Sequence, residues 1–351
     1  MPEVREARVV AQAKINLFLR VLAREASGYH QLETLFQRLA LGDDVRLRGG
    51  VAGRALDCRG ADVGPVERNL AWRAATAYAE RAGWPDGFAI EIDKRIPVGG
   101  GLGGGSADAG AVLRCLDALH PSPLGSAALL AIAATLGADV PFLTAEAPRA
   151  LAWGRGERML ALPPLPARRA HLACFTEGVS TPAAFGALAE LRARDADASA
   201  ARPILWTPER LARWDDVALV ATNDLEAPVF AMREDVAGMR RLFGDVTREL
   251  AIQHDVTAGP SPEAASRLDP APAPDGDTEP IALMSGSGAT VFLLTPLGGL
   301  HLVFDVRAPD ADPAAPAPLE IVTTRTATAV ASVAIDGSGP EGRVAGPSSD
   351  G

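Results

Sequence analysis

The stretch PVGGGLGGGSADAG, residues 97–110, has the composition of a loop that binds phosphate. It contains seven glycines, and Leu102 is its one large side chain. Because glycine lacks a Cβ atom, backbone N–H groups in such a loop can approach a ligand closely. A helix that begins at the end of the loop adds unpaired N–H donors and the positive end of its dipole. The stretch therefore predicts a phosphate site in front of a helix N-terminus.

Other interpretations of this loop are weaker. Gly99, Gly101 and Gly104 satisfy G-x-G-x-x-G, but the stretch lies about a hundred residues into the chain and no clean βαβ unit with a ribose-binding acid follows. The P-loop of many ATPases ends in Gly-Lys-Ser/Thr, which is absent here. A plain surface loop would rarely sit tightly between a strand and an alanine-rich helix. These comparisons favour the phosphate site.

Two ionisable residues could act on a phosphoryl group held by the loop. Apolar and polar residues alternate over 13–20, which predicts a half-buried strand with Lys14 and Asn16 on one face. Asp139 lies in GADVPFLT, just after a predicted helix that ends near Leu136. From spacing alone, Lys14 could be a solvated strand lysine and Asp139 an ordinary turn aspartate.

The elements that must position these residues follow from periodicity and end signals. The expected helices cover 69–81, 107–119, a segment ending near 136, segments starting at Thr181 and Thr207, and 224–243. The expected strands include 13–20, a strand from Phe88 that ends at Pro97, two short strands around WGRGERM, HLACFT, a strand–turn–strand unit over 281–294, and 319–333. Residues 256–280 and 309–318 are rich in proline, alanine and aspartate, and we expect loops or disorder there.

Composition limits the classes of function. The chain has 351 residues, 48% of them hydrophobic, which is enough for two packed domains. The formal net charge of −10 argues against binding to nucleic acid or to a membrane surface. The three cysteines are far apart and form no CxxC pair, so we expect neither a zinc site nor disulfides. The N-terminus lacks a signal-peptide pattern, and no apolar run could span a bilayer. We expect a cytoplasmic protein.

Several motifs together resemble those of the GHMP kinases, the superfamily of galactokinase, homoserine kinase, mevalonate kinase and phosphomevalonate kinase. PVGGGLGGGSADAG is similar to their phosphate-binding motif and MSGSGATVF to their C-terminal glycine motif. AKINLFLRV, GYHQLETLFQRL, GADVPF, STPAAF and Asn223-Asp224 resemble the branch whose substrate is 4-diphosphocytidyl-2-C-methyl-D-erythritol. The motifs occur in the family's order between residue 11 and about residue 294.

The resemblance implies a two-domain α+β fold with the active site in the cleft between the domains. It implies an N-terminal ATP- and phosphate-binding domain over 1–155 and a C-terminal substrate domain over 156–335. A proline- and alanine-rich insertion at 256–280 is longer than we expect for the family, and residues 336–351 extend past its usual end as a flexible tail. Neither addition interrupts a motif.

The resemblance also implies the reaction. ATP would phosphorylate a hydroxyl of the erythritol unit by direct transfer, in the non-mevalonate pathway to isoprenoid precursors. Asp139 matches the family's base, and Lys14 matches the lysine that keeps this carboxylate ionised and offsets charge on the phosphoryl group. Mg²⁺ is expected because phosphoryl transfer needs the charge of ATP screened. Ser106 and Asp108 could each contact the metal, but the sequence does not decide its ligands.

Binding residues are implied in the same way. Asn16 would orient the substrate, Tyr29 would stack on cytosine and His30 would hydrogen-bond its edge. Phe185 matches the aromatic residue on the opposite side of the base, with Thr181 one helical turn before it. ATP would be held by Pro97, Gly99, Gly100, Gly101, Leu102, Gly103, Gly104, Gly105 and Ser106. Gly286 and Gly288, in the late glycine motif, would brace this loop or approach the substrate.

Each binding residue also has a plainer interpretation. Tyr29 could be a turn aromatic, Phe185 a core residue and Thr181 only the N-cap of its helix, with Pro182 at the first helical position.

Other functions remain open on the sequence alone. A sibling kinase acting on mevalonate or homoserine would not need Tyr29, His30 and Phe185, because those substrates carry no base. A catalytically inactive, ligand-binding relative would not need both Lys14 and Asp139. A dinucleotide-dependent oxidoreductase is the most distant alternative. The expected partners are ATP and the cytidine-bearing substrate alone, and a monomer and a homodimer are equally open.

Overall fold

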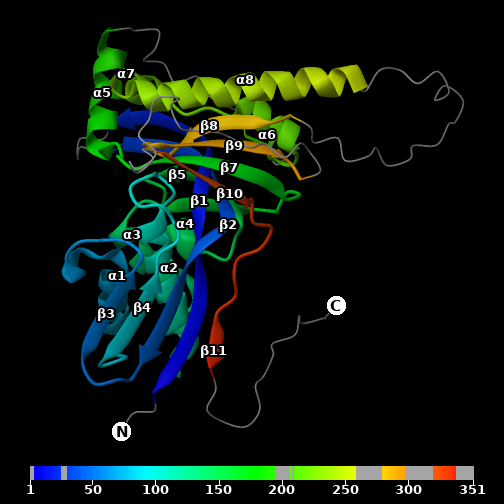
Figure 1. Cartoon of the computed structure of the whole chain (residues 1–351). Helices are drawn as coiled ribbons and strands as arrows, with labels where there is room; N and C mark the ends of the chain where they lie inside the picture. Colours follow the sequence, from blue (N-terminus) through cyan, green and yellow to red (C-terminus); the bar gives the residue numbers. More distant parts are fainter. Residues whose placement is uncertain are drawn as a thin grey trace, which may run out of the picture.

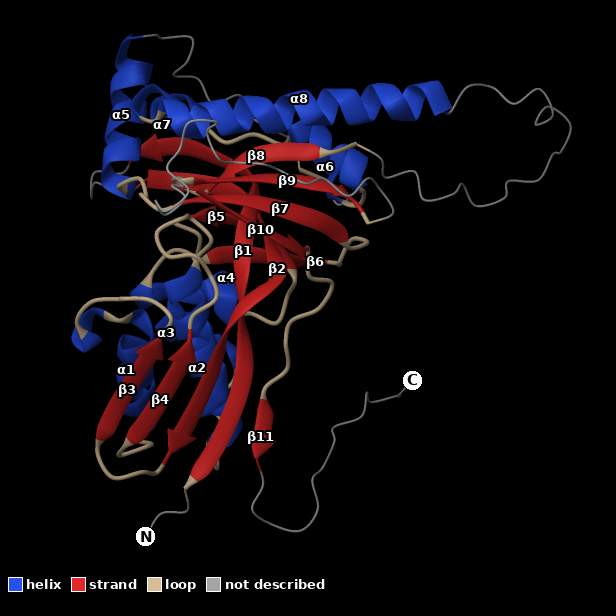
Figure 2. Ribbon diagram, in the orientation of Figure 1, coloured by secondary structure: helices blue, strands red, loops and turns tan. Residues whose placement is uncertain are grey.

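A computed structural model describes residues 4–24, 30–194, 206–207, 209–257, 279–297 and 319–336. Two β-sheets and the helices packed on them form the described part of the chain (Figure 2). The larger sheet has the strand order β11-β1-β2-β4-β3, with β5 paired to β2 and β6 paired to β5. The smaller sheet has the order β10-β7-β9-β8. This mixture of largely antiparallel sheets and helices confirms the expected α+β class.

A long antiparallel hairpin runs through the molecule and carries Lys14 (Figure 1). It consists of β1 (Arg5–Arg24) and β2 (His30–Gly49), paired from Arg5↔Gly49 to Arg24↔His30. The expectation of a half-buried strand is wrong, because Lys14 is only 3% and Asn16 only 1% exposed. Lys14 is covered because the glycine segments around Gly103 and Gly286 lie directly against its side chain.

The first half of the chain supplies the elements around the glycine loop. They are β3 (Arg54–Arg59), the 3-10 turn η1 (Val66–Arg68), α1 (Leu70–Ala82), β4 (Phe88–Asp93), α2 (Gly104–Leu119), α3 (Ser126–Leu136), α4 (Val140–Thr144), β5 (Arg149–Gly154) and β6 (Arg158–Leu162). The predicted capping of α1 is confirmed at Gly83, which ends the helix in the left-handed conformation with φ of 66°. Helix α2 begins at Gly104, three residues earlier than expected, so the last loop glycines already belong to its first turn.

The second half builds the smaller sheet, and three of its helices, over 181–194, 226–232 and 234–257, cover one face of that sheet (Figure 1). The elements are β7 (Arg168–Phe175), α5 (Thr181–Arg194), the 3-10 turn η2 (Glu209–Leu211), α6 (Trp214–Val220), α7 (Glu226–Met232), α8 (Glu234–Thr257), β8 (Ile281–Ser285), β9 (Thr290–Pro296), β10 (Leu319–Arg325) and β11 (Ala334–Asp336). Strand β11 returns to the larger sheet and pairs with β1. Among the described helices, none combines the length and the apolar character needed to cross a membrane.

Three local expectations in this half are wrong. The helix predicted over 224–243 is broken at Arg233, whose backbone (φ −138°, ψ 86°) separates α7 from α8. The helix expected to start at Thr207 is only the 3-10 turn η2. The strand expected over 319–333 stops at Arg325, and a separate short strand forms at 334–336. The predicted insertion, the 309–318 loop and the predicted tail fall almost wholly outside the described residues, although α8 continues to Thr257.

Asn223 joins the β1 strand to the smaller sheet. Its Nδ2 atom donates to the carbonyl oxygens of Met284 and Gly286, each at 2.8 Å, and its Oδ1 atom accepts from the Leu225 N–H at 2.9 Å. Leu19 of β1 forms a parallel bridge with Asn223. Because the amide is buried, all of these hydrogen bonds are made away from water. The motif residue Asn223 therefore has a structural task in this fold.

The Asn223→Ala substitution should lower the free energy of unfolding by about 2–4 kcal/mol, because it leaves two carbonyls and one N–H buried without their partner. Chemical denaturation followed by circular dichroism measures this loss. Asn69→Ala is the control, since Asn69 makes one capping hydrogen bond to the Ala71 N–H and should cost about 1 kcal/mol. Equal losses for the two variants would contradict the assigned role of Asn223.

Candidate active site

A cavity of about 490 Å³, here called the Lys14 cavity, collects residues from distant parts of the chain. Its walls come from the β1–β2 hairpin, the glycine loop, the start of α4, the β5–β6 turn, the start of α5 and the turn after β8. The chemically relevant lining residues are Lys14, Asn16, Thr34, Gly99, Gly101, Gly103, Gly104, Gly105, Ser106, Asp139, Arg155, Thr181, Phe185, Gly286 and Gly288. The structure thus brings most of the sequence-predicted site residues to one cavity.

Lys14 and Asp139 form an ion pair in this cavity. The Lys14 Nζ atom lies 3.2 Å from Asp139 Oδ2, 2.8 Å from Asn16 Oδ1 and 5.7 Å from the centroid of the Phe36 ring. The lysine side chain is 3% exposed, whereas that of Asp139 is 31% exposed. A buried ammonium group needs such partners, because burial without them is costly. Within the pair, the Asp139 carboxylate is therefore the more accessible group and the Lys14 ammonium the more buried one.

The Asn16 amide is fixed by a short hydrogen-bond chain. Its Nδ2 atom donates to Thr34 Oγ1 at 2.8 Å, and the Thr34 hydroxyl donates to the Phe18 carbonyl at 2.7 Å. This chain leaves Asn16 Oδ1 to accept from Lys14. Sequence reasoning missed Thr34, which lies on β2, far from Asn16 along the chain. Asn16 therefore orients Lys14, and its predicted contact with substrate stays a prediction.

The late glycine motif braces the glycine loop. The Ser285 hydroxyl donates to the Gly101 carbonyl at 3.1 Å, and the Thr290 N–H donates to the Gly100 carbonyl at 3.2 Å. A Cβ atom on Gly101 would lie 2.4 Å from the Ser285 carbonyl oxygen, and Gly101 has a φ of +77°. A Cβ atom on Gly286 would lie 3.4 Å from Lys14 Nζ. Two glycine-rich segments can therefore meet beside Lys14 only because side chains are absent.

Another cavity, of about 240 Å³ and here called the loop cavity, lies along residues 96–105. Pro97, Gly100 and Leu102 line this cavity and are not part of the lining of the Lys14 cavity. Gly99, Gly101 and 103–105 line both. The predicted phosphate-binding residues are therefore divided between two cavities that share the loop as a wall.

A buried charge cluster forms one side of the loop cavity. Lys94 Nζ lies 2.5 Å from Asp43 Oδ2 and 2.8 Å from Asp108 Oδ2, and all three side chains are at most 4% exposed. Asp43 Oδ1 accepts the N–H groups of Arg95 and Ile96 at 2.6 and 2.8 Å. Burial, opposed by Lys94, raises the pKa of Asp108 to about 7. The Asp108 Oδ2 atom is thus bound to Lys94. Of the two candidate metal contacts, Ser106 lines the Lys14 cavity and Asp108 lines the loop cavity.

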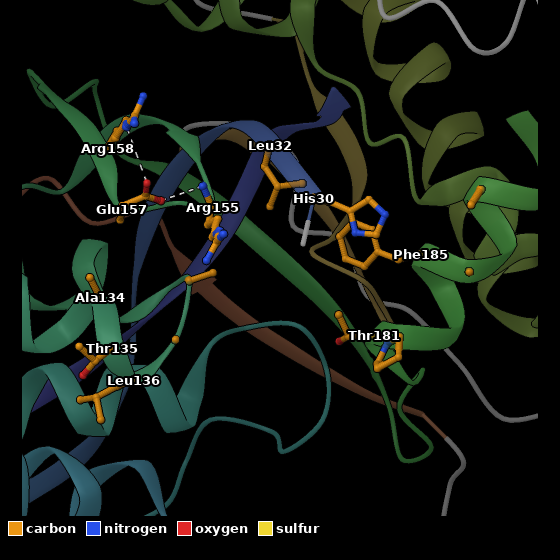
Figure 3. A pocket seen from close by; sticks show the side chains of 15 residues that line it. His30, Leu32, Ala134, Thr135, Leu136, Arg155, Glu157, Arg158, Thr181 and Phe185 are labelled. Carbon is orange, nitrogen blue, oxygen red and sulfur yellow. Dashed lines mark hydrogen bonds and ion pairs between the residues drawn. The ribbon is translucent and has the colours of Figure 1, made fainter. Parts of the chain in front are cut away.

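A third cavity, of about 920 Å³ and here called the His30 cavity, continues from the Lys14 cavity (Figure 3). The two share Leu32, Ala138, Arg155, Thr181 and Phe185. The His30 and Phe185 rings stack with centroids 4.5 Å apart and planes 19° apart. Phe185 is half-buried and faces both cavities, so it is more than a core residue. Tyr29 lies outside the described residues.

Thr181 and Arg155 complete the wall between the cavities. Helix α5 begins at Thr181, and the Thr181 and Ser287 hydroxyls are hydrogen-bonded at 2.8 Å. Arg155 lies in the turn between β5 and β6, where its backbone N–H donates to Glu157 Oε2 at 2.7 Å. Its side chain brings a cation to both cavities (Figure 3). Sequence reasoning missed Arg155, although WGRGERM was recognised as a turn.

The fold and this site define a GHMP kinase. The sequence of residues 69–146, which include the glycine loop and Asp139, matches the protein-family model described as the GHMP kinases N terminal domain. A homoserine kinase from Cytophaga hutchinsonii, 15% identical, shares the fold with a TM-score of 0.50 over 96% of this chain and 98% of its own. The site residues agree with this class, because a glycine loop at a helix N-terminus stands beside a lysine–carboxylate pair.

More similar relatives identify the branch of the superfamily. The 4-diphosphocytidyl-2-C-methyl-D-erythritol kinase of Leifsonia xyli subsp. xyli is 37% identical over 73% of this chain and 86% of its own length. That of Thermus thermophilus is 41% identical over 67% of this chain and 80% of its own. A solved 4-(cytidine 5'-diphospho)-2C-methyl-D-erythritol kinase is 34% identical, with a TM-score of 0.57, over 82% of this chain and 89% of its own. The chain belongs to the 4-diphosphocytidyl-2-C-methyl-D-erythritol kinase family and is an ATP-dependent kinase.

The Gly101→Ala substitution should destabilise the protein and raise the KM for ATP. The new methyl group would collide with the Ser285 carbonyl, and a positive φ costs a non-glycine residue about 1–3 kcal/mol. Gly105→Ala is the matched control, because the nearest atom to its methyl group would be Leu70 Cδ1 at 3.8 Å. Calorimetry and ATP titration compare the two variants. A Gly101→Ala protein as stable as Gly105→Ala would contradict the bracing of the loop.

The Asp108 carboxyl should make stability fall as pH rises. Burial raises its pKa from the ordinary aspartate value of 3.8 to about 7 in the folded protein, so between these values the folded state binds more protons than the unfolded state. The free energy of unfolding then decreases with rising pH across this window. Asp108→Asn should flatten the decrease between pH 5 and pH 8, as measured by urea denaturation. Asp93→Asn, which removes an exposed carboxylate, should leave the slope unchanged. Identical slopes in both variants would refute the assignment.

Proposed function

We propose that this kinase transfers the γ-phosphoryl group of ATP to a hydroxyl of 4-diphosphocytidyl-2-C-methyl-D-erythritol, in the non-mevalonate pathway to isoprenoid precursors. That compound is the substrate in the names of the relatives described above. The observation that carries the proposal is the 3.2 Å contact between Lys14 and Asp139 in a cavity walled by the glycine loop.

Asp139 acts as the base in this proposal. As the substrate hydroxyl oxygen forms its bond to the γ-phosphorus, Asp139 accepts the hydroxyl proton, and the bond from the γ-phosphorus to the bridging oxygen breaks to release ADP. The Lys14 ammonium offsets charge on the transferred group. Asp139 precedes α4, but its carboxylate makes no capping hydrogen bond to that helix, which leaves it available to the substrate. Transfer is direct, with no covalent enzyme intermediate.

The glycine loop and the first turn of α2 hold the phosphates of ATP. Their backbone N–H groups are donors, and the N-terminal end of this 16-residue helix favours negative charge. Mg²⁺ supplies screening of the phosphate charge. The part of the chain that the structure describes contains no group of three or more His, Cys, Asp or Glu side chains arranged for a metal. The Ser106 hydroxyl, which lines the Lys14 cavity, would be the protein's contact with the metal.

The His30 cavity takes the cytidine end of the substrate. A base sandwiched between two rings needs them roughly 7 Å apart, but the His30 and Phe185 centroids are 4.5 Å apart. We propose that the base replaces the imidazole against Phe185, so that His30 can hydrogen-bond the edge of the base. Thr181 lies one turn before Phe185 on the same helix face. Arg155, between the two cavities, then faces the diphosphate of the substrate.

A coupled ADP-release assay tests the function. The purified protein is given ATP, Mg²⁺ and one of three acceptors: the diphosphocytidyl methylerythritol, mevalonate or homoserine. Turnover with the cytidine-bearing acceptor alone is the expected result. Turnover with a smaller alcohol instead would retain the Lys14–Asp139 chemistry and eliminate the cytosine site. Tight NAD binding without ATP binding would favour an oxidoreductase.

The Asp139→Asn substitution should lower kcat by about 10²–10⁴-fold, the usual contribution of a positioned base. The amide keeps the size of the side chain but cannot accept the proton as a carboxylate does. Steady-state kinetics with saturating ATP measure the loss, and an unchanged circular dichroism spectrum verifies the fold. Full activity in this variant would eliminate the mechanism while leaving substrate binding intact.

The Phe185→Ala substitution should raise the KM for the cytidine-bearing acceptor by roughly 5–150-fold, because a stacked base contributes about 1–3 kcal/mol. The KM for ATP should not change. Leu188→Ala provides the control from the same helix, since Leu188 is 5% exposed and packs in a cluster of buried apolar side chains that includes Phe175 and Val229. That variant should lose stability and keep both KM values. If both substitutions raised the KM for the cytidine-bearing acceptor to the same extent, Phe185 would act only through packing.

A further inference from the structure

We infer that Arg38 is a positioning residue for the Lys14–Asp139 pair, an inference that rests on the proposed function. Arg38 lies on β2 directly opposite Lys14 in the antiparallel register of the hairpin. Its side chain is 1% exposed, and it does not line the Lys14 cavity. It can therefore influence the reaction only through the residues it holds.

The Arg38 guanidinium binds the segment that carries Asp139. Its Nη2 atom donates to the carbonyl oxygens of Phe142 and Ala145, each at 2.8 Å, and its Nε atom donates to that of Ala147 at 3.1 Å. Asp139 is the N-cap residue of α4, and Ala145 is the C-cap residue of this five-residue helix. The last carbonyls of a helix lack partners within it. Arg38 satisfies them and fixes α4 against β2.

A column of stacked side chains connects Arg38 to the other member of the pair. The Arg38 guanidinium lies 5.1 Å from the centroid of the Phe142 ring. Phe142 stacks on Phe36 with centroids 4.8 Å apart and planes 13° apart. Lys14 Nζ lies 5.7 Å from the Phe36 centroid on the same hairpin. One continuous contact path therefore sets both the position of the ammonium and the position of α4 beneath the carboxylate.

The partners of Arg38 are unusual for a buried cation. Its guanidinium contacts carbonyl oxygens and an aromatic face, and no carboxylate among the described residues pairs with it. Burial, and then the nearby charge of Arg114, lower the pKa of Arg38 to about 9, which still leaves it protonated at neutral pH. Burying a charge without a counter-ion is costly, and an apolar side chain of similar volume is often as stabilising. From this geometry, the role of the guanidinium is to hold α4 in place, not to increase the stability of the fold.

A purely structural role predicts different behaviour, and Arg149 provides the comparison. Arg149 is also 1% exposed and also donates to carbonyl oxygens, those of Pro163 at 3.1 Å and Leu211 at 2.7 Å. It lies on β5, and both carbonyls that accept its hydrogen bonds lie outside α4. Its removal should lower stability without displacing Asp139.

The experiment measures kcat, both KM values and the melting temperature of Arg38→Met, Arg38→Lys and Arg149→Met in the ADP-release assay. Arg38→Met should lose roughly 10–100-fold in kcat with both KM values within about twofold, because a displacement of about 1 Å at a reacting group can cost 10²-fold. Arg38→Lys, which keeps a cation and one donor group, should lose less. Arg149→Met should lower the melting temperature about as much as Arg38→Met does, but it should leave kcat unchanged.

A double variant separates positioning from packing. In the Asp139→Asn background, Arg38→Met should cause no further loss of kcat, because residues that act through one group are not additive. Losses that multiply would overturn the inference, as would an unchanged kcat in Arg38→Met. Should Arg38→Met fail to fold, Arg38→Lys decides, and wild-type kcat in that variant overturns the inference. Full activity in Asp139→Asn alone would instead refute the proposed function.

Discussion

The buried ammonium group of Lys14 is the constraint around which the site is arranged. A cation that is 3% exposed must find its partners within the protein, and here they are Asp139, Asn16 and the face of Phe36. Room for these partners exists because glycines surround the lysine. A Cβ atom on Gly103 would lie 3.1 Å from the Lys14 side chain. The glycines are thus required by the burial of Lys14 as well as by ligand binding.

The same constraint explains why two glycine motifs so far apart in the chain belong to one site. The turn after β8 contacts the loop through the Ser285 hydroxyl and contacts Lys14 through Gly286. Asn223 in turn holds the Gly286 carbonyl and bridges to β1. The loop is therefore fixed from the smaller sheet as well as from α2. Donors fixed in advance stabilise developing charge without reorganising during the reaction.

Much of the fold could be predicted from local pattern, and the errors have local causes. The strand that begins at Phe88, the capped helix α1 and the strand–turn–strand unit near 281–294 depend on periodicity and end signals, and the structure has all three, although the first strand ends at Asp93 rather than at Pro97. The break at Arg233 gave no such signal, because neither proline nor glycine marks it. The alternation over 13–20 predicted that one side of this strand faces solvent. The glycine loop and the turn after β8 instead cover Lys14 on that side. Burial by distant segments leaves no trace in a local pattern.

By itself, the sequence determined the residue types that can do the chemistry: a loop of glycines before a helix, a lysine and an asparagine on one strand face, and an aspartate just after another predicted helix. These follow from local geometry and from motif resemblance. Only the tertiary structure decided which groups meet. It paired Lys14 with Asp139 at 3.2 Å, directed Asp108 to Lys94, and brought in Thr34, Arg155 and Arg38. The physical reason is that hydrogen bonds and ion pairs act over a few ångströms in space, whatever the separation of their residues along the chain.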